Sequence, residues 1–155
     1  MGNKLITTLC IAHKDKKILL GMKKRGFGEG RWNGFGGKVD SGETIEEAAR
    51  REIQEEAGIE VIDLEKLGVI DFKFQTTGEE IEVNIFKSND FSGEPIETEE
   101  MRPAWFSENE IPFSEMWPDD IFWMPFFLSG KKFKGKFIFG EKDMILEKNL
   151  EEVEK

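Results

Sequence analysis

Three glutamates in this chain have the spacing that metal-dependent phosphate chemistry requires. Glu52, Glu55 and Glu56 occupy positions i, i+3 and i+4, so a helix would bring their carboxylates onto one face, which we call the acidic face. Two like charges about 4 Å apart cost roughly 4 kcal/mol at a protein surface. A hard divalent cation removes that repulsion, and all-oxygen ligands favour Mg²⁺ or Mn²⁺ over zinc. The alternative is a solvated acidic helix surface held by salt bridges.

Charge also suggests the reaction that such a cluster performs. A phosphoanhydride is anionic and repels an attacking hydroxide, whereas divalent cations lower the pKa of bound water and stabilise the departing pyrophosphate. One of the three glutamates would act as the base, and the sequence does not distinguish which one. Arg51 lies beside them and is expected to anchor Glu43 or to orient a ligand.

The segment around the glutamates carries the signals of a helix. Thr44 and Glu47 form a T-x-x-E capping box, which predicts a helix start near Thr44. Gly58 can adopt the left-handed conformation that ends a helix. A small apolar stripe beside the acidic face is expected to pack on a sheet and consists of Ala49, Ile53 and Ala57.

Residues 37–59 as a whole are similar to the Nudix box, the metal-binding loop-helix-loop of enzymes that hydrolyse nucleoside diphosphates linked to another group. Every fixed position of that signature is matched, by Gly37, Glu43, Arg51, Glu52, Ile53, Glu55, Glu56, Gly58 and Ile59. The resemblance implies an α+β Nudix fold, in which a mixed β-sheet is sandwiched between α-helices (α/β/α). It also implies catalytic roles for Arg51 and the acidic face.

The remaining sequence predicts strands interrupted by a second helix. Strands are expected at 4–12, 17–22, 68–76, 80–88, 102–106, 131–139 and 143–150, with turns at 13–16, 77–78 and 140–141. Pro118 marks a helix start, and Pro125 is expected to kink that helix or end it early. Residues 151–155 are expected to fray. This order predicts a mixed sheet flanked by helices, in a single domain over residues 1–155.

Composition narrows the classes of function. The chain has 155 residues and a formal charge of −10, which argues against binding a nucleic-acid polymer, because such binding requires a basic surface. Cys10 is the only cysteine, so no intramolecular disulfide can form. No apolar run approaches the roughly 20 residues of a membrane span, and no signal peptide is visible. We expect a monomer in the cytoplasm, and a mitochondrial or nuclear fraction stays open.

Three further blocks extend the resemblance over nearly the whole chain. They are GMKKRGFGEGRWNGFGGKV at 21–39, EMRPAWF at 100–106 and MWPDD at 116–120. With these blocks the chain resembles the eukaryotic MutT-homologue branch of the Nudix family, the oxidised purine nucleoside triphosphatases. The resemblance implies hydrolysis of small purine nucleoside triphosphates, such as 8-oxo-dGTP and 2-hydroxy-dATP, to the monophosphate and pyrophosphate. Such an activity would cleanse the nucleotide pool and prevent mutagenic incorporation into DNA.

The same resemblance implies which residues hold the substrate and the metal. The substrate-binding positions are Thr8, Lys23, Phe27, Asn33, Phe35, Gly36, Gly37, Lys38, Phe72, Ile81, Met101, Trp117, Pro118, Asp119, Asp120 and Trp123. Metal ligands would come from Glu52, Glu55, Glu56, Glu100 and the backbone carbonyl of Gly36 or Gly37. Trp117 and Phe27 offer flat surfaces for a purine, with stacking worth about 1–3 kcal/mol per base. Asn33 offers a donor and an acceptor to a base edge.

Asp119 and Asp120 carry the most specific hypothesis. Two neighbouring carboxylates in an apolar pocket resist ionising together, so one is expected to hold a proton near neutral pH. A shared proton would let the pair switch between donor and acceptor patterns and admit both an oxidised guanine and an oxidised adenine. The alternatives are that one aspartate caps the helix after Pro118 and that Trp117 and Trp123 are core aromatics. Phe72 and Ile81 would then only pack beneath the ligand.

Departures from the branch and competing functions are also visible. Close relatives commonly carry methionine where this chain has the stiffer Ile81, which bears on the balance among purine substrates.

A Nudix hydrolase of ADP-ribose or dinucleoside polyphosphates is a second interpretation, which Asn33 and residues 117–120 oppose. A Nudix-fold binding module without turnover is a third. Such modules typically lose glutamates of the box, and all three are present here.

Overall fold

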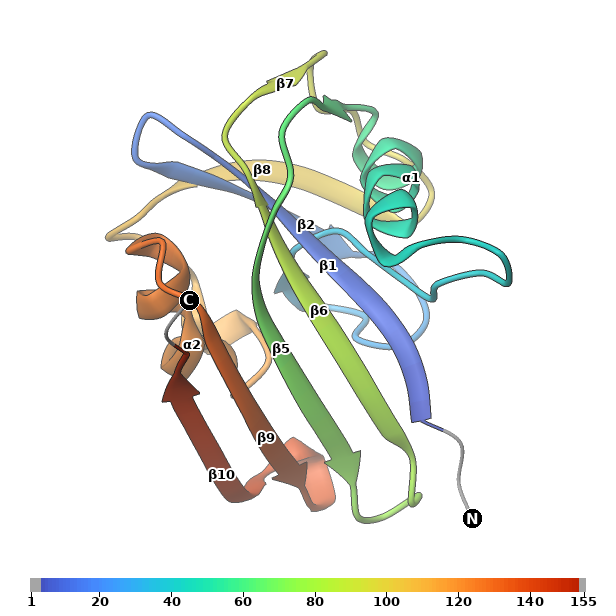
Figure 1. Cartoon of the computed structure of the whole chain (residues 1–155), viewed down its shortest axis with the longest axis vertical. Coiled ribbons are helices and arrows are strands. Elements are labelled where there is room, and N and C mark those ends of the chain that lie inside the picture. Colours follow the sequence, from blue (N-terminus) through green and yellow to red (C-terminus); the bar gives the residue numbers. More distant parts are fainter. Residues whose placement is uncertain (1–3, 154–155) are drawn as a thin grey trace.

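The computed structural model describes residues 4–153, which form a mixed sheet and two α-helices (Figure 1). The strand order is β10-β9-β5-β6-β1-β2-β3, and β8 pairs with β2. The strands of this sheet are β1 (Lys4–Lys14), β2 (Lys17–Lys23), β3 (Trp32–Asn33), β5 (Glu65–Phe74), β6 (Glu80–Ser88), β8 (Met101–Ser107), β9 (Phe133–Phe139) and β10 (Ile145–Glu152). The other elements are α1 (Ile45–Ala57), α2 (Asp120–Leu128), the small pair β4 (Glu60–Val61) and β7 (Phe91–Ser92), and two 3₁₀ turns, η1 (Phe113–Glu115) and η2 (Glu141–Asp143).

Strand β1 positions residues 26–37, which we call the glycine-rich segment. It runs parallel to β6 from Lys4 to Ala12 and pairs with β2 only near the hairpin turn. Along most of β1, the edge opposite β6 is therefore not paired with β2. Isolated β-bridges on β1 join Cys10 to Phe35 and Thr7 to Lys38. The glycine-rich segment is thereby held against the centre of the sheet.

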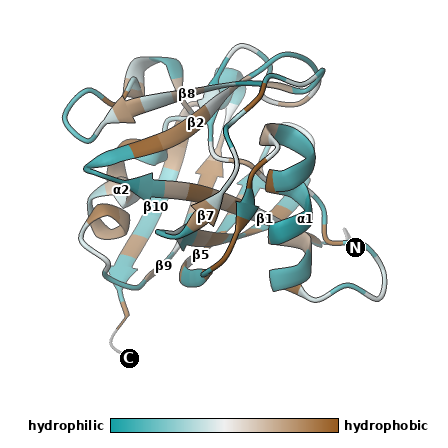
Figure 2. Cartoon of the chain, turned by 90° about the horizontal axis from the view of Figure 1, so that it is seen from above, coloured by the Kyte–Doolittle hydropathy of each residue, from teal (hydrophilic) through white to brown (hydrophobic). Residues whose placement is uncertain are grey.

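The two faces of the sheet carry different helices. Cys10 and Ala12 of β1 share a buried cluster with Ile53 of α1, whereas Ile11 shares the other cluster with Trp123 of α2. Because successive residues of a strand point to opposite faces, α1 and α2 must cover opposite sides of the sheet. In Figure 2 hydrophobic colour occurs in several strands and in α2, while much of α1 is hydrophilic. The predicted α/β/α arrangement is confirmed.

The predicted boundaries of α1 are confirmed in detail. The Thr44 hydroxyl accepts from the Glu47 N–H at 3.0 Å, and the Glu47 carboxylate accepts from the Thr44 N–H at 2.8 Å, so both halves of the capping box are present. Gly58 ends the helix with φ 73°, in the left-handed region. The stripe of Ala49, Ile53 and Ala57 is fully buried. These local signals fix the rotation of α1 and hence the direction of its glutamates.

The carboxyl-terminal half corrects two expectations. Pro125 does not end α2 early, because the helix continues to Leu128 and buries Trp123, Met124 and Phe127 in the core. That burial offsets the hydrogen bond that proline cannot make. Strand β10 extends to Glu152, so the fraying expected at 151–152 is wrong, and residues 154–155 lie outside the described range. Over residues 4–153, no helix has the length and apolar character needed to cross a bilayer.

Candidate active site

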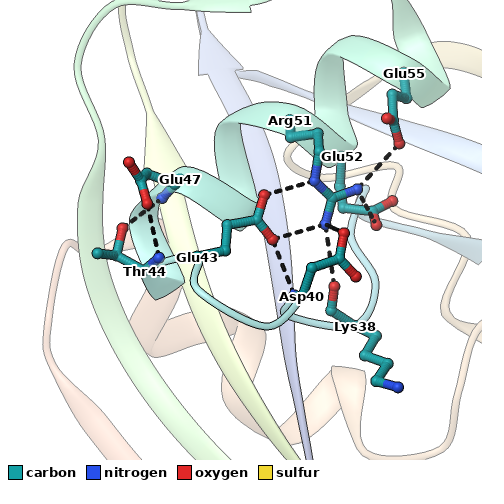
Figure 3. A network of polar contacts seen from close by, with 8 residues as sticks. All are labelled: Lys38, Asp40, Glu43, Thr44, Glu47, Arg51, Glu52 and Glu55. Atoms are coloured by element: carbon teal, nitrogen blue, oxygen red, sulfur yellow. Dashed lines mark hydrogen bonds and ion pairs between the residues drawn. The ribbon is translucent and has the colours of Figure 1, made fainter.

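Arg51 organises the acidic face of α1 (Figure 3). Its Nε–H and Nη2–H donate to the two carboxylate oxygens of Glu43, at 2.6 and 3.0 Å, as the predicted anchoring requires. Its Nη1–H donates to Glu52 at 2.9 Å and to Glu55 at 3.2 Å. Glu56 turns the other way, and its Oε1 accepts from the Gly36 N–H at 3.0 Å. The acidic face is thus partly neutralised on one side and points into the interior on the other.

Two glutamates of the acidic face, the buried Glu56 and the half-buried Glu52, resist ionisation. Burial raises the pKa of Glu56 to about 7, and the charge of Glu52 adds to that effect. Burial also raises the pKa of Glu52, although hydrogen bonding to Arg51 opposes it. In contrast, the hydrogen bond from Arg51 holds the pKa of Glu43 at about 2. A cation beside Glu52 and Glu56 would favour their ionised forms, so the site suits a hard divalent ion.

Gly36 and Gly37 bring the backbone between β1 and the acidic face. A Cβ at Gly36 would stand 1.8 Å from the Thr8 carbonyl oxygen, so only glycine fits there. A Cβ at Gly37 would stand 2.7 Å from Oε2 of Glu52 and would displace that carboxylate. The Gly37 carbonyl already accepts from the Thr8 N–H at 2.9 Å. Among the donors in residues 4–153, none bonds the Gly36 carbonyl, which makes it the freer oxygen.

A cavity of about 320 Å³, which we call the aromatic cavity, opens beside the acidic face. Its walls come from β1, β5 and β6, from the glycine-rich segment and from the residues that precede α2. Of the predicted substrate-binding residues, those that line it are Thr8, Lys23, Phe27, Asn33, Gly36, Gly37, Lys38, Phe72, Ile81, Met101, Trp117, Asp119, Asp120 and Trp123. Glu56 lines the same cavity, so the cavity reaches the acidic face.

Asp119 and Asp120, the aspartate pair, lie in the wall of the aromatic cavity and are each only 3% exposed. Burial raises the pKa of Asp119 to about 6 and raises that of Asp120 further, with the charge of Asp119 adding to the second shift. The Trp123 Nε1–H donates to Asp119 Oδ2 at 2.8 Å. Asp119 stands at the N-cap of α2, but its side chain makes no capping hydrogen bond. The helix-capping alternative therefore fails, and burial favours a protonated form of the pair.

Comparison with known proteins agrees with this geometry. The family model described as the NUDIX domain matches residues 4–127. The chain belongs to the Nudix family. It is 53% identical over 149 residues to a protein of Danio rerio and 50% identical over 154 residues to one of Mus musculus, both named oxidized purine nucleoside triphosphate hydrolase. The alignments cover 96% of both chains in the first case and 99% of both in the second.

A solved structure shows the same Nudix architecture. The chain is similar to a MutT protein from Bacillus halodurans, with a TM-score of 0.85 and 28% sequence identity. The match covers 95% of this chain and 97% of that chain. At this coverage the likeness extends beyond residue 127, where the match of the family model ends.

Glu100, the predicted metal ligand outside the Nudix helix, is held by two cationic side chains. Arg25 Nη2 lies 2.9 Å and Lys23 Nζ 3.2 Å from its carboxylate oxygens. The hydrogen bond from Arg25, followed by that from Lys23, lowers the pKa of Glu100. Over residues 4–153, no three histidine, cysteine or acidic side chains form a ready metal cage. Cation binding would therefore have to compete with Arg51, Lys23 and Arg25 for the carboxylates.

Two predicted substrate-binding residues do not line the aromatic cavity. Phe35 is fully buried in the cluster on the α1 face, because its backbone pairs with Cys10 and its side chain points away from the cavity. Pro118 is half-buried in the turn before α2 and directs the aspartate pair without reaching the cavity. For these two positions the structure supports only a backbone or positional role.

Two aromatic residues of the cavity wall were not predicted from the sequence. Phe74 and Phe139 line the cavity and lie 5.5 Å apart between ring centroids, and Phe74 also meets Phe27 at 5.7 Å. Side chains two apart on a strand share a face, so Phe74 lies on the same face as Phe72. This alternation could have predicted Phe74 as a cavity residue. Phe139 enters the site only because β9 pairs with β5, and that long-range pairing has no local signature.

Proposed function

We propose that this Nudix protein hydrolyses oxidised purine nucleoside triphosphates, such as 8-oxo-dGTP and 2-hydroxy-dATP, to the monophosphate and pyrophosphate. The names and full-length similarity of the two vertebrate relatives support this substrate class. The observation that carries the proposal is the aspartate pair, buried in an aromatic cavity that also reaches the acidic face. The activity would remove damaged nucleotides from the cytoplasmic pool before a polymerase uses them.

Base recognition follows from the lining of the aromatic cavity. Phe27 and Trp117 provide flat aromatic surfaces on which a purine stacks. Asn33 presents a donor and an acceptor, and the aspartate pair presents one proton that either carboxyl can hold. Oxidation changes the hydrogen-bonding pattern of a purine, so a pair that can donate or accept matches an oxidised guanine and an oxidised adenine. The triphosphate would extend toward Lys23 and Lys38, whose positive charges attract its oxygens.

Nudix hydrolases generally use divalent cations, and the donor set here fits one. We assign Mg²⁺ to this site, with Mn²⁺ as a substitute, because the available ligands are all oxygen atoms. Glu52, Glu55, Glu56, Glu100 and the Gly36 carbonyl would hold it. When bound, the cation supplies positive charge that offsets the phosphate oxygens and acidifies water.

The side chains around the acidic face orient the reaction. Arg51 fixes Glu43 and two glutamates of the acidic face, which keeps the carboxylates in a defined direction. Burial raises the pKa of Glu56 to about 7, so this carboxyl can take up or release a proton near neutral pH as substrate arrives.

Pyrophosphate release tests the proposal. The substrates would be 8-oxo-dGTP, 2-hydroxy-dATP, dGTP and dATP, each with and without Mg²⁺. We expect metal-dependent turnover of the two oxidised nucleotides well above that of the normal ones. Equal turnover of all four would contradict the proposed selectivity. Absence of turnover, with tight binding of the oxidised forms, would instead favour a Nudix-fold binding module.

A further inference from the structure

Arg31, Trp117 and Asp143 come from three distant segments and meet at the rim of the aromatic cavity. The Arg31 Cζ lies 4.1 Å from the centroid of the Trp117 ring. The Arg31 Nη1–H donates to Asp143 Oδ2 at 2.9 Å. All three line a neighbouring cavity of about 480 Å³ that shares Phe27 and Trp117 with the aromatic cavity. Arg31 and Asp143 do not line the aromatic cavity itself; Arg31 contacts the indole that does, and its charge also acts at longer range on Asp119.

Trp117 is not part of a helix or strand, so its orientation depends on side-chain contacts. Besides Arg31, these are the rings of Phe27, Phe74 and Phe139, at centroid distances of 5.1, 6.2 and 6.0 Å. Trp117 lies in the irregular segment between η1 and α2, and its indole is half-buried. A guanidinium over an aromatic ring is attracted by the negative ring face, and its planar shape favours stacking. Arg31 therefore favours one orientation of the Trp117 plane.

Arg31 is in turn fixed by its own segment and by the turn before β10. The Arg31 N–H donates to the Gly28 carbonyl at 3.1 Å, and its carbonyl accepts from the Lys23 N–H at 3.0 Å. Asp143 lies in η2, where Lys142 and Asp143 have φ values of 55° and 58°. Residues with a side chain seldom adopt this left-handed conformation. The turn therefore keeps an uncommon backbone while it presents the Asp143 carboxylate to Arg31.

We propose that Arg31, clamped by Asp143, is a positioning residue that holds the Trp117 indole in the orientation on which the purine stacks. Arg31 thus contributes to base affinity without contacting the base. The inference rests on the proposed function, because it assumes that a purine occupies the aromatic cavity. It adds a specificity element from the carboxyl-terminal turn, which the Nudix box and its glutamates do not include.

The experiment compares Arg31→Ala, Arg31→Lys, Asp143→Ala and the Arg31→Ala/Asp143→Ala double variant with the wild type. For each, KM and kcat are measured with 8-oxo-dGTP, and the Kd of 8-oxo-dGMP is measured without metal. We expect Arg31→Ala to raise KM and Kd about threefold to tenfold, with kcat nearly unchanged. Arg31→Lys should recover part of the loss because it keeps the charge but not the planar stacking. Thermal unfolding checks that each variant is folded.

A matched control is available in the same chain. The Arg102 Cζ lies 5.1 Å from the centroid of the Trp32 ring, and neither residue lines the aromatic cavity. Arg102→Ala therefore removes an arginine–tryptophan contact of the same kind at another place. We expect its KM and Kd to match the wild type. An equal rise in Arg102→Ala and Arg31→Ala would show a general loss of packing and overturn the inference.

The clamp makes a separate prediction about additivity. If Asp143 acts through Arg31, Asp143→Ala should raise Kd less than Arg31→Ala does, and it should add nothing in the double variant. Full additivity would overturn the clamp. A normal Kd in Arg31→Ala, with an active wild type, would overturn the inference alone. A wild type that neither hydrolyses 8-oxo-dGTP nor binds 8-oxo-dGMP would overturn the proposed function, and the inference with it.

Discussion

Two pairs of carboxylates lie at one cavity, and their surroundings differ. Asp119, Asp120 and Glu56 are buried in its lining, and Glu52 is half-buried on the same helix face as Glu56. Glu52 and Glu56 on α1 contact a guanidinium and a backbone N–H. Asp119 and Asp120 lie among aromatic side chains, and Asp119 accepts from the Trp123 indole. Burial is the largest cause of the raised pKa in all four side chains. The two pairs differ in whether a positive charge other than a proton can approach them.

This difference separates two tasks. A cation and phosphates can approach the acidic face, so its repulsion is relieved by a metal. The aspartate pair is closed off by aromatic walls, so its repulsion is relieved by keeping a proton. Similar carboxylate pairs thus serve catalysis or substrate selection according to whether the fold lets a cation approach them. Substitutions at the acidic face should therefore change turnover, and substitutions at the aspartate pair should change substrate choice.

The largest effect is expected at Glu56. Glu56→Gln removes a carboxylate that no other residue replaces, so kcat for 8-oxo-dGTP should fall by at least about 10²-fold. Initial rates of pyrophosphate release measure this loss. Glu46→Gln on the exposed side of the same helix is the matched control and should keep wild-type rates. Retention of most activity by Glu56→Gln would contradict the role assigned to the acidic face.

Asp119→Asn should give the second largest effect. Asparagine can still accept from Trp123 but cannot share a proton with Asp120. We expect kcat/KM to fall about tenfold to hundredfold more for one oxidised purine than for the other, because a wrong donor leaves a buried group unpaired. Steady-state kinetics across pH measures this, and the wild type should show different pH profiles for the two substrates. Identical profiles and equal losses would rule out the shared proton.

The sequence predicts the acidic face better than the aromatic cavity for a physical reason. The face depends on contacts within one helix and its caps, so spacing, Thr44 and Gly58 determine it. The cavity depends on the pairing of β9 with β5 and on the packing of α2, so Phe139 and the buried side chain of Phe35 could not be assigned locally. Of the two outcomes expected at Pro125, the early end of the helix is wrong for the same reason, because burial of its neighbours outweighs a local propensity.

Stability should depend on pH through Glu56. Its pKa is about 7 in the fold against 4.5 ordinarily, so the folded protein binds more protons than the unfolded chain between those values. Stability should therefore fall as pH rises through that window. In the metal-free protein, urea unfolding should show a decline on the order of 2 kcal/mol more for the wild type than for Glu56→Gln. Parallel stability curves for the two proteins would mean that Glu56 is not desolvated.

The smallest effect is expected at Ile81, in the wall of the aromatic cavity. Ile81→Met exchanges a stiff side chain for a flexible one of similar volume, so the fold should be unaffected. The ratio of kcat/KM between 8-oxo-dGTP and 2-hydroxy-dATP should shift by about twofold to fivefold. Competition assays with both nucleotides present measure the ratio directly. A shift as large as that of Asp119→Asn would mean that wall shape, rather than the aspartate pair, sets the choice.

The division of tasks is tested most directly by one ratio. It is kcat/KM for 8-oxo-dGTP divided by kcat/KM for dGTP, measured under single-turnover conditions in the wild type, Glu56→Gln and Asp119→Asn. We predict that Glu56→Gln lowers both values alike and preserves the ratio, whereas Asp119→Asn reduces the ratio toward one. A ratio that collapses in Glu56→Gln, or survives in Asp119→Asn, would contradict the separation of hydrolysis from base selection.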